Sequence, residues 1–449
     1  MTEFERISKD WAFIDSSLIG SEGFADGEYL TQHPRESDEK YEVRKEIATY
    51  ENIIYSRVTK YAGYLFKVPP LRETNNILLK EIVEDLSGTR ENADVFMSNF
   101  SKDAKAKGAG LVVVDTMQTT GSLEDQITGR ELPYVTAVKP EMVIDYRITK
   151  KGAFEYVAYK DVVDNTAFNS GDVPDRIIRY YDEYIWQVYQ DTGVGVGSLI
   201  EEGEHGLGVC PVLMFSEKGV FLSTGEFSQI ASLSKEHYNL KSERRDLLRS
   251  QTFSVLAISA DQGSRPEVTI GTDNALIYTG SNSPSFISPD AAQVAAYETN
   301  ISNTLKIMDD TTYTVTTTTA QESGIALELK MQGLNASLSG FAKSLELFER
   351  NIWEIICLYL GLPEDSVIVS YVTEFEIIDI QTELNILSQM KANADLPQYE
   401  GAKIKTIIAA DLKSLEPEMQ TLIFNEVDDY VKAREVGEPL EDEDQGENT

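Results

Sequence analysis

A long run of helically spaced apolar residues, preceded by a run of threonines, constrains this sequence more than any other feature. Apolar side chains recur from Leu327 to Ile355 at intervals that alternate between 4 and 3 residues, so they share one helical face. The pattern ends at Gly361, with Pro363 just beyond, which is a normal C-terminal stop. A single helix over Ser323–Leu360 would be a rod of roughly 55–60 Å. A rod of that length indicates a subunit that spans a larger assembly rather than one compact core.

A second amphipathic helix is predicted just before the threonines, over Asp290–Asp310. Its apolar residues fall on one face, and Pro289 suits a first helical turn. The β-branched run Thr311–Thr319 then resists helix formation. One interpretation is a polar surface connection. The other is a loop that touches a sliding polyanion through hydroxyls and methyls, without the salt-dependent grip that lysine or arginine would add.

A third helix is predicted over Glu226–Arg249, and a small β unit separates it from the second. The strand candidates of this unit are Phe253–Ile258, Glu267–Ile270 and Ala275–Tyr278. Both helices therefore enter and leave the β unit from the same side. A lone helix–β–helix protrusion cannot bury both helix faces, so we expect neighbouring subunits to supply the missing partner.

The rest of the chain alternates between helical and β patterns, which predicts the α+β class. Residues 1–40 are polar and weakly periodic, and they are predicted to be an arm that orders against something else. Helices are expected at Glu42–Phe66, Asn76–Leu86, Ala93–Lys107, Gln381–Asn393, Gly401–Ala409 and Pro417–Lys432. Strands are expected at Leu111–Asp115, Tyr134–Val138, Met142–Arg147, Phe154–Val162, Arg176–Tyr181, Tyr184–Gln190 and Val212–Phe215, with a hairpin turn at Asp182-Glu183 and a strand pair at Val367–Tyr371 and Phe375–Ile378.

The charge balance is strongly acidic, with 75 Asp and Glu against 40 Lys and Arg and a formal net charge of -35. This argues against a high-affinity nucleic-acid binder of the basic-patch kind, but it does not exclude a protein past which DNA slides. Cys210 and Cys357 sit in apolar surroundings and are interpreted as buried thiols of a reducing compartment, with a disulfide as the less favoured alternative. Because Met1–Asp15 has no apolar core segment and no membrane span is present, a soluble intracellular product is expected.

The usual catalytic constellations are missing from the sequence. It has no Gly-rich phosphate loop, no His-Glu-x-x-His motif, no Cys-x-x-Cys pair and no Gly-x-Ser-x-Gly elbow. The glycine run Gly193–Gly197 lacks a βαβ context and is interpreted as a flexible β connection, while Glu441–Asp444 lacks the spacing of a calcium loop. We therefore expect no enzyme, no cofactor and no metal site. A hydrolase with scattered residues is the enzymatic alternative, and a perturbed carboxylate pair in a deep pocket would support it.

The order of elements resembles that of the portal proteins, the head–tail connector rings of tailed double-stranded DNA bacteriophages. The resemblance covers roughly Tyr41 to Lys432, and its specificity comes from collinear order. The matching stretches are Tyr50–Arg57 through Gly63–Pro70, Gly206–Val212, His237-Tyr238 and Leu327–Lys330.

The resemblance implies a portal-like α+β fold in a ring oligomer, with each segment in a named part. These parts are an N-terminal arm (1–40), an α/β wing (41–222), stem helix 1 (223–251), a β clip (252–288), stem helix 2 (289–310), a tunnel loop (311–322), the wing's long helix and strands (323–378), a helical crown (379–434) and an acidic disordered tail (435–449).

The function implied by the resemblance is that of a DNA conduit. Such a ring, usually a dodecamer, sits at one vertex of the capsid among major capsid and scaffold proteins, and double-stranded DNA is packaged and ejected through it. The large terminase subunit docks on the clip, and head–tail connector or adaptor proteins replace it later. The implied location is the virion, with assembly in the host cytoplasm and no membrane. The alternative is a capsid-associated structural or scaffold-like adaptor without a channel, and a ring with a DNA-wide hole separates the two.

Three groups of site residues follow from this correspondence. The predicted DNA-channel residues are Lys306, Asp310, Thr312, Tyr313, Thr314, Val315, Thr316 and Thr317, where Lys306 forms either a basic ring facing DNA or an interhelix ion pair. The predicted subunit-interface residues are His237, Arg244, Arg245, Arg249, Tyr297 and Ile301; for the arginines, ion pairs with nearby acids are the default interpretation. The predicted docking residues of the clip are Asp261, Arg265, Glu267 and Asp273.

Overall fold

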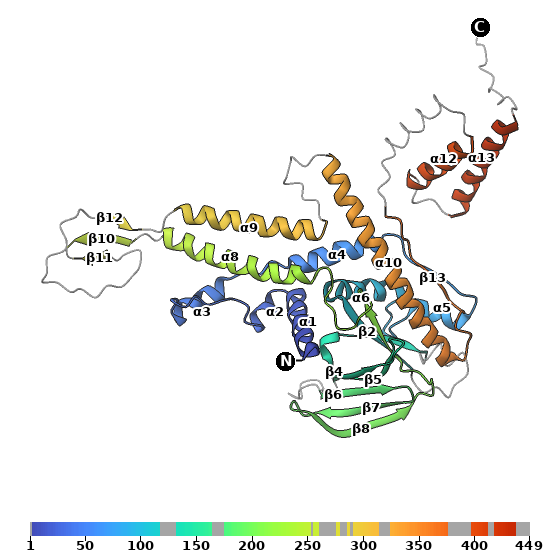
Figure 1. Ribbon diagram of the computed structural model, residues 1–449, viewed down its shortest axis with the longest axis horizontal. Helices are drawn as coiled ribbons and strands as arrows, with labels where there is room; N and C mark the ends of the chain where they lie inside the picture. The colour runs from blue at the N-terminus through green and yellow to red at the C-terminus, as the bar shows by residue number, and fades with distance from the viewer. Residues whose placement is uncertain are drawn as a thin grey trace, which may run out of the picture. The chain divides into compact units, whose positions relative to one another are not determined.

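The computed structural model describes residues 2–116, 132–163, 175–252, 255–259, 275–278, 285–287, 291–313, 324–375, 397–411 and 417–436. Helices and strands are mixed, as the α+β prediction requires (Figure 1). The chain divides into two compact units, Met1–Phe375 and Glu376–Thr449.

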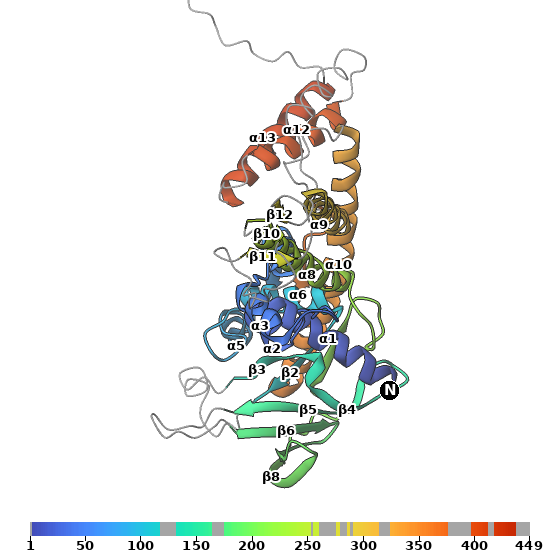
Figure 2. The same cartoon turned by 90° about the vertical axis from the view of Figure 1, so that its left-hand side faces the viewer.

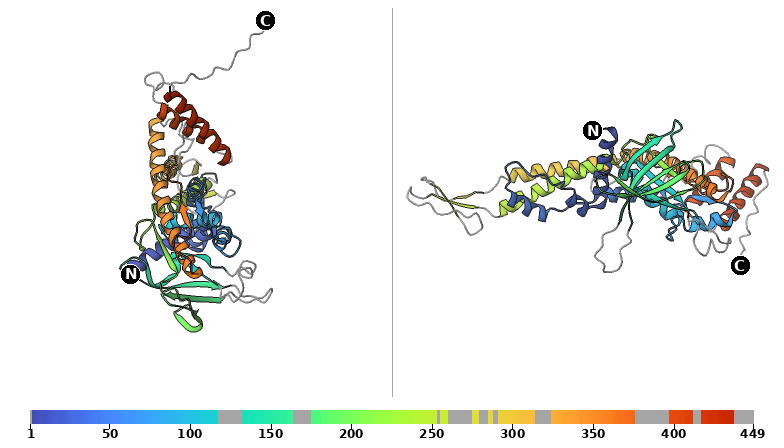
Figure 3. Two further views of the ribbon diagram at one scale, coloured as in Figure 1. Left: turned by 90° about the vertical axis from the view of Figure 1, so that its right-hand side faces the viewer. Right: turned by 90° about the horizontal axis from the view of Figure 1, so that it is seen from below.

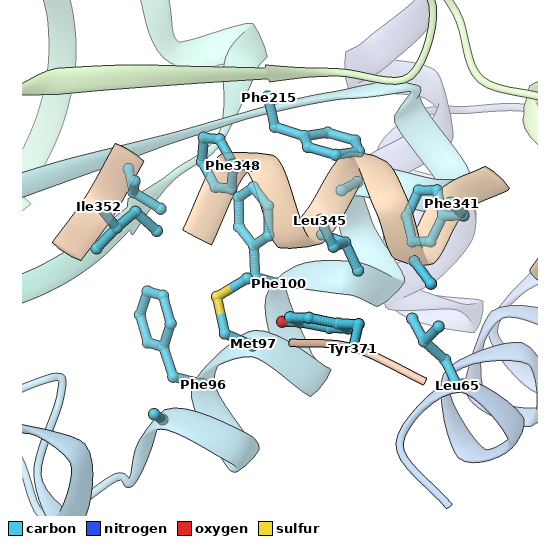
Figure 4. Packing of buried hydrophobic residues seen from close by; sticks show 14 of the residues in the cluster. Leu65, Phe96, Met97, Phe100, Phe215, Phe341, Leu345, Phe348, Ile352 and Tyr371 are labelled. Carbon is cyan, nitrogen blue, oxygen red and sulfur yellow. The ribbon is translucent and has the colours of Figure 1, made fainter. Parts of the chain in front are cut away.

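The long helix α10 (Gly324–Leu360) forms the centre of the first unit. Its predicted apolar stripe is buried from Leu334 to Ile355 against α4 (Ile53–Leu65), α6 (Ala93–Lys107) and nearby strands (Figure 4). The ring of Phe348 stacks on Phe100 with the centroids 5.0 Å apart. Gly361 follows the helix with a φ of 64°, a left-handed conformation that glycine adopts without steric cost. The sequence prediction of this helix is confirmed.

A three-stranded antiparallel sheet lies beside this helix, in the order β3-β2-β9. The strands are β2 (Ala109–Asp115), β3 (Tyr134–Val138) and β9 (Val212–Ser216). In β2, Val112 and Val114 face the helices, while Leu111 and Val113 face a second core. Because both faces of the central strand are buried, its sequence is a continuous apolar run rather than an alternating one.

The second core lies against a five-stranded antiparallel meander, in the order β4-β5-β6-β7-β8. Its strands are β4 (Val143–Ile148), β5 (Phe154–Val163), β6 (Asp175–Asp182), β7 (Ile185–Asp191) and β8 (Val196–Glu204), and the short helix η1 (Pro140–Met142) leads into β4. The predicted turn after β6 is confirmed, since the Asp182 carboxylate accepts from the backbone N–H groups of Tyr184 and Ile185 at 2.8 and 2.9 Å. The glycine run lies in the connection between β7 and the edge strand β8, as predicted, and its last residues belong to β8, which pairs with β7 and was not predicted.

The first residues, predicted to be an arm, fold as helices packed on the rest of the first unit. They form α1 (Glu3–Ile19) and α2 (Ser21–Asp26), with a capping box made by Thr2 and Glu5. The Trp11 side chain is 0% exposed, and its indole N–H donates to the carbonyls of Lys107 and Ser223 at 3.2 and 3.1 Å. Figure 2 shows α1, β2 and β3 on the same side of the five-stranded sheet. The few apolar residues of α1 are enough to hold it in place, because they pack into a core built by distant segments.

The helix predicted over Glu42–Phe66 is two helices, α3 (Asp38–Ile47) and α4. Asn52 caps α4 by accepting from the backbone N–H of Tyr55 at 3.1 Å. The ring of Tyr50, in the break, stacks on Phe24 with the centroids 3.8 Å apart. The apolar spacing runs on through the break, so periodicity alone could not detect the competing cap and the stacked ring.

The first strand of the predicted pair near residue 370 is present, and residues 376–378 of the second lie outside the described residues. The strand β13 (Ile368–Ser370) pairs with β1 (Leu71–Glu73), far away in sequence, and α5 (Ile77–Glu84) follows β1. Arg72 of β1 points inward and donates to the fully buried Glu349 carboxylate of α10 at 2.5 and 3.1 Å. This buried ion pair holds β1 against α10, and the sequence does not reveal it.

The helix–β–helix unit is present as predicted. The helices α8 (Ser228–Thr252) and α9 (Ala291–Thr311) run side by side, and a small sheet joins them (Figures 1 and 3). Its strands are β10 (Val255–Ser259), β11 (Ala275–Tyr278) and β12 (Ser285–Ile287), in the order β11-β10-β12. The strand β12 was not predicted, and the candidate at 267–270 lies outside the described residues.

Both cysteines are free and buried, as predicted. Burial raises the pKa of the Cys210 thiol to about 12 and raises the pKa of the Cys357 thiol above its usual value. Neither thiol is therefore ionised at neutral pH. Among the described residues, no helix is long and apolar enough to cross a membrane.

The second unit contains the helices α12 (Pro397–Asp411) and α13 (Pro417–Val436), close to the predicted bounds. They pack where Gly401 faces Val431, since a Cβ on Gly401 would lie 2.4 Å from a Val431 methyl carbon. The predicted helix at 381–393 and residues 437–449 of the predicted tail lie outside the described part.

Candidate functional site

The predicted channel residues that the structure describes lie on the last two turns of α9 and just after it. Lys306 and Asp310 are exposed, Thr312 is buried, and Tyr313 is half-buried. The Asp310 carboxylate pairs with Lys330 of α10 at 3.0 Å. Thr314, Val315, Thr316 and Thr317 lie outside the described residues.

One face of α9 packs on α8 and the opposite face is exposed. The packed stripe contains Val294, Tyr297, Ile301, Leu305 and Met308, as the spacing predicted. The exposed face consists mostly of small and neutral side chains: Ala292, Gln293, Ala295, Ala296, Glu298, Thr299, Asn300, Ser302, Asn303, Lys306, Ile307 and Asp310. This face carries one cation and two carboxylates, so it cannot grip a polyanion strongly.

The C-terminal end of α9 is tied to the body of the first unit. The Asp309 carboxylate forms an ion pair with Arg57 of α4, and the two side chains are only 13% and 12% exposed. The backbone N–H of Thr312 donates to Met308 at 3.1 Å and closes the last turn. Since Asp310 also pairs with α10, two neighbouring carboxylates of α9 hold different helices.

The Glu226 carboxylate joins four elements just before α8 begins. One of its oxygens accepts from the hydroxyl of Tyr313, after α9, at 3.3 Å. The other oxygen accepts from Ser337 of α10 at 2.9 Å and from the Lys105 ammonium of α6 at 2.5 Å. We refer to Lys105, Glu217, Glu226, Tyr313 and Ser337 as the root junction, because the start of α8 and the end of α9 meet there.

Lys105 is the centre of the root junction. Its side chain is 1% exposed, and its ammonium also donates to Glu217 at 2.7 Å. It lies 4.6 Å from the ring centroid of Tyr61, 5.1 Å from that of Phe227 and 5.0 Å from that of Phe341.

The surroundings keep the Lys105 ammonium charged. Burial acts to lower the pKa of Lys105, but Tyr61, Glu217 and Glu226 outweigh it and raise the pKa above the ordinary value. Burial also raises the pKa of Tyr61 to about 12, and burial followed by Glu226 raises the pKa of Tyr313. Both tyrosines are therefore protonated donors at neutral pH. Sequence reasoning missed this junction, because Lys105 sits among polar residues that resemble a solvated helix end.

Several predicted interface residues make contacts within one chain. The His237 ring is 2% exposed and lies 2.9 Å from a Glu51 oxygen, while the Tyr297 hydroxyl donates to Glu243 at 3.0 Å. Ile301 is buried between α8 and α9. These three side chains therefore have partners within one chain, and a subunit contact stays a prediction.

The predicted arginines lie nearer the surface. Arg245 donates to the carbonyl of Ile47 at 2.5 Å, Arg249 is exposed, and Arg244 is half-buried. The clip residues Asp261, Arg265, Glu267 and Asp273 lie outside the described residues, so docking there also stays a prediction.

A cavity between the β3-β2-β9 sheet and the five-stranded sheet bears on the enzymatic alternative, which a carboxylate pair would support. The cavity has a volume of about 330 Å³ and is lined in part by Asp115, Tyr134 and Tyr181. Burial raises the pKa of Asp115, which accepts from the Tyr181 hydroxyl at 3.2 Å. The other carboxylate of the lining, Asp161, is held by Arg179 at 2.7 Å. In the part of the chain that the structure describes, no cluster of side chains is arranged to hold a metal ion.

Among solved structures, this chain is similar to one from a phage-like particle. The match is described as the neck of an empty GTA particle computed with C6 symmetry, at 11% identity and a TM-score of 0.38, over 78% of this chain and 90% of that chain. No protein-family model and no curated protein matches the sequence. Since the similarity is low, the proposed function rests on this chain's own residues.

Proposed function

We propose that this protein is the portal protein of a tailed double-stranded DNA phage or a related particle. Its subunits form a ring, a dodecamer by the family's usual number, at one vertex of the capsid. DNA is packaged and ejected through the channel. The protein is not an enzyme in this proposal, and the packaging motor supplies the chemical energy.

The exposed face of α9 is the observation that carries the proposal. A conduit must lie close to DNA without holding it, because every phosphate neutralised by lysine or arginine adds salt-dependent affinity. Alanine, serine, threonine and asparagine on this face offer contact with little charge. Lys306 gives one cation per subunit, which in a ring becomes a single sparse belt. The net charge of -35 adds repulsion of phosphates over the remaining surface.

The arrangement of the stem supports the same proposal. Among the described residues of the α8–α9 hairpin, one stripe of α9 packs on α8, and the exposed face of α9 can line a channel. The root junction and the Arg57–Asp309 pair fix this hairpin to the body, which keeps the lining in place under load.

The proposal assigns partners by position. The tip of the hairpin, β10 to β12, is the docking surface for the large terminase subunit and later for the head–tail connector or adaptor protein. The outer parts of the first unit contact major capsid and scaffold proteins. The mature protein resides in the virion, after assembly in the host cytoplasm.

Imaging of the purified full-length protein tests the proposal. We expect light scattering and negative-stain microscopy, with scaffold protein added if needed, to reveal rings of about twelve subunits with a central hole wide enough for DNA. Compact particles without a hole under all these conditions would contradict it and favour the non-channel capsid adaptor.

A further inference from the structure

Tyr313 has a backbone conformation that needs an explanation. Its φ is 53°, in the left-handed region, where a residue with a Cβ is disfavoured. Such conformations persist only where the surroundings hold them. Tyr313 lies just beyond Thr311, the last residue of α9, so this conformation sets the direction in which the chain leaves the stem helix.

The Tyr313 ring is held against a glycine of α10. A Cβ added to Gly333 would lie 2.7 Å from the Cε1 atom of Tyr313, so no larger residue fits there while the ring keeps its place. Gly333 is in the interior of a long helix, where glycine is unfavourable relative to alanine. The close ring contact supplies a reason for the glycine.

The Tyr313 hydroxyl is held by a carboxylate that cannot itself move freely. Glu226 is fixed by the buried Lys105 ammonium at 2.5 Å and by the Ser337 hydroxyl at 2.9 Å. By contrast, the bond from Tyr313 is longer, at 3.3 Å, and it ties the root junction to the end of α9. One turn earlier, the largely buried Arg57–Asp309 pair provides a firm second attachment.

We propose that Tyr313 is a catch between the stem and α10. With its ring on Gly333 and its hydroxyl on Glu226, the left-handed residue ends α9 in its present position. When the hydroxyl leaves Glu226, Tyr313 relaxes toward the right-handed region and the last turn of α9 shifts, with Asp309 as the pivot. The catch stands on these contacts alone. The further step, in which passing DNA releases the Tyr313 hydroxyl from Glu226, rests on the proposed function.

Hydrogen exchange in the full-length protein tests the catch. The amides of Thr312 and Tyr313 donate to the carbonyls of Met308 and Asp310 at 3.1 and 3.4 Å, so their exchange reports the last turn of α9. We expect these amides to exchange about tenfold faster in Tyr313→Phe, which keeps the ring and removes a hydrogen bond to a charged group. The matched control is Tyr297→Phe, since that hydroxyl also donates to a glutamate, Glu243, at 3.0 Å. In the control these amides should exchange at the wild-type rate.

A second variant, in α10, disturbs the same contact between Tyr313 and Gly333. Gly333→Ala displaces the Tyr313 ring while leaving its hydroxyl in the sequence, and we expect the same amides to exchange faster. Wild-type exchange at these amides in both Tyr313→Phe and Gly333→Ala overturns the catch.

A third experiment tests the conformational role of Tyr313 separately from the proposed DNA channel. Adding a double-stranded DNA oligonucleotide to assembled wild-type rings should change exchange at these amides, and should change it less in Tyr313→Phe rings. If the variants behave as expected but DNA has no effect, the link to DNA is refuted while the catch remains. If no rings form at all, the proposed function fails, and the exchange result on the catch is untouched.

Discussion

Single residues in this protein show how burial changes a charge. Asp115 ends the central strand β2, and burial raises the pKa of its carboxyl even though Tyr181 and the backbone N–H of Thr116 donate to it. A carboxyl whose pKa is raised in the folded state binds its proton more tightly there than in the unfolded chain. It therefore reduces stability as the pH rises from the ordinary value of 3.8 through the raised folded-state value.

Replacing Asp115 by asparagine should remove this pH dependence. We expect Asp115→Asn to be more stable than wild type at pH 7, because the amide has no charged form to desolvate. Below the ordinary pKa of aspartate the two proteins should be equally stable. Urea unfolding at several pH values measures the difference. A wild type that is the more stable of the two at pH 7 would show that the Asp115 charge is favourable in place.

At the scale of elements, the sequence predicts those whose pattern is local. The bounds of α6 and β3 agree with the prediction to the residue, and α10 agrees to within one residue at its start. The failures have tertiary causes. α1 has few apolar residues but meets a core made elsewhere, and β8 follows a glycine run that local propensity assigns to a connection.

The candidate site also has a part that the sequence predicts and a part that it does not. The packed stripe of α9 follows from spacing alone. The root junction does not, because Lys105, Glu226 and Ser337 lie more than a hundred residues apart and each looks like a solvated surface residue in its own segment. Nothing in the local sequence marks a lysine that will be enclosed by three aromatic rings.

The packing of α10 gives a prediction with a control in the same helix. Leu338 is 1% exposed and Leu347 is 61% exposed. We expect Leu338→Asp to prevent folding or assembly, since a buried unpaired charge costs several kcal/mol. Leu347→Asp should fold normally, with a change in the free energy of unfolding within about 0.5 kcal/mol. Circular dichroism and thermal unfolding distinguish them, and equal behaviour of the two variants would mean that the Leu338 stripe is not packed.

At the scale of the whole molecule, the proposed ring converts a single side chain into a repeated one. Lys306 is one exposed lysine on α9, but a closed ring repeats it around the channel at a constant height. Each phosphate that such lysines neutralise adds about 0.9 to the slope of log affinity against log salt.

The salt dependence of DNA binding by assembled rings should therefore depend on Lys306. We expect Lys306→Ala to weaken binding of double-stranded DNA and to make its salt slope shallower, by about 0.9 for each phosphate that is no longer neutralised. Lys151→Ala, at the exposed turn before β5, is the control and should leave the slope unchanged. Fluorescence anisotropy at several salt concentrations measures both. An unchanged slope for Lys306→Ala would show that this lysine does not contact DNA phosphates.

The two buried cysteines have a practical consequence for following this protein at work. Cys210 and Cys357 are the only thiols of the chain, and burial keeps both protonated at neutral pH. A maleimide dye should therefore not react with the native protein. A single Ser302→Cys change would place one reactive thiol on the exposed face of α9. In a ring these thiols would face one another across the lumen, so energy transfer between dyes would report its width as DNA enters.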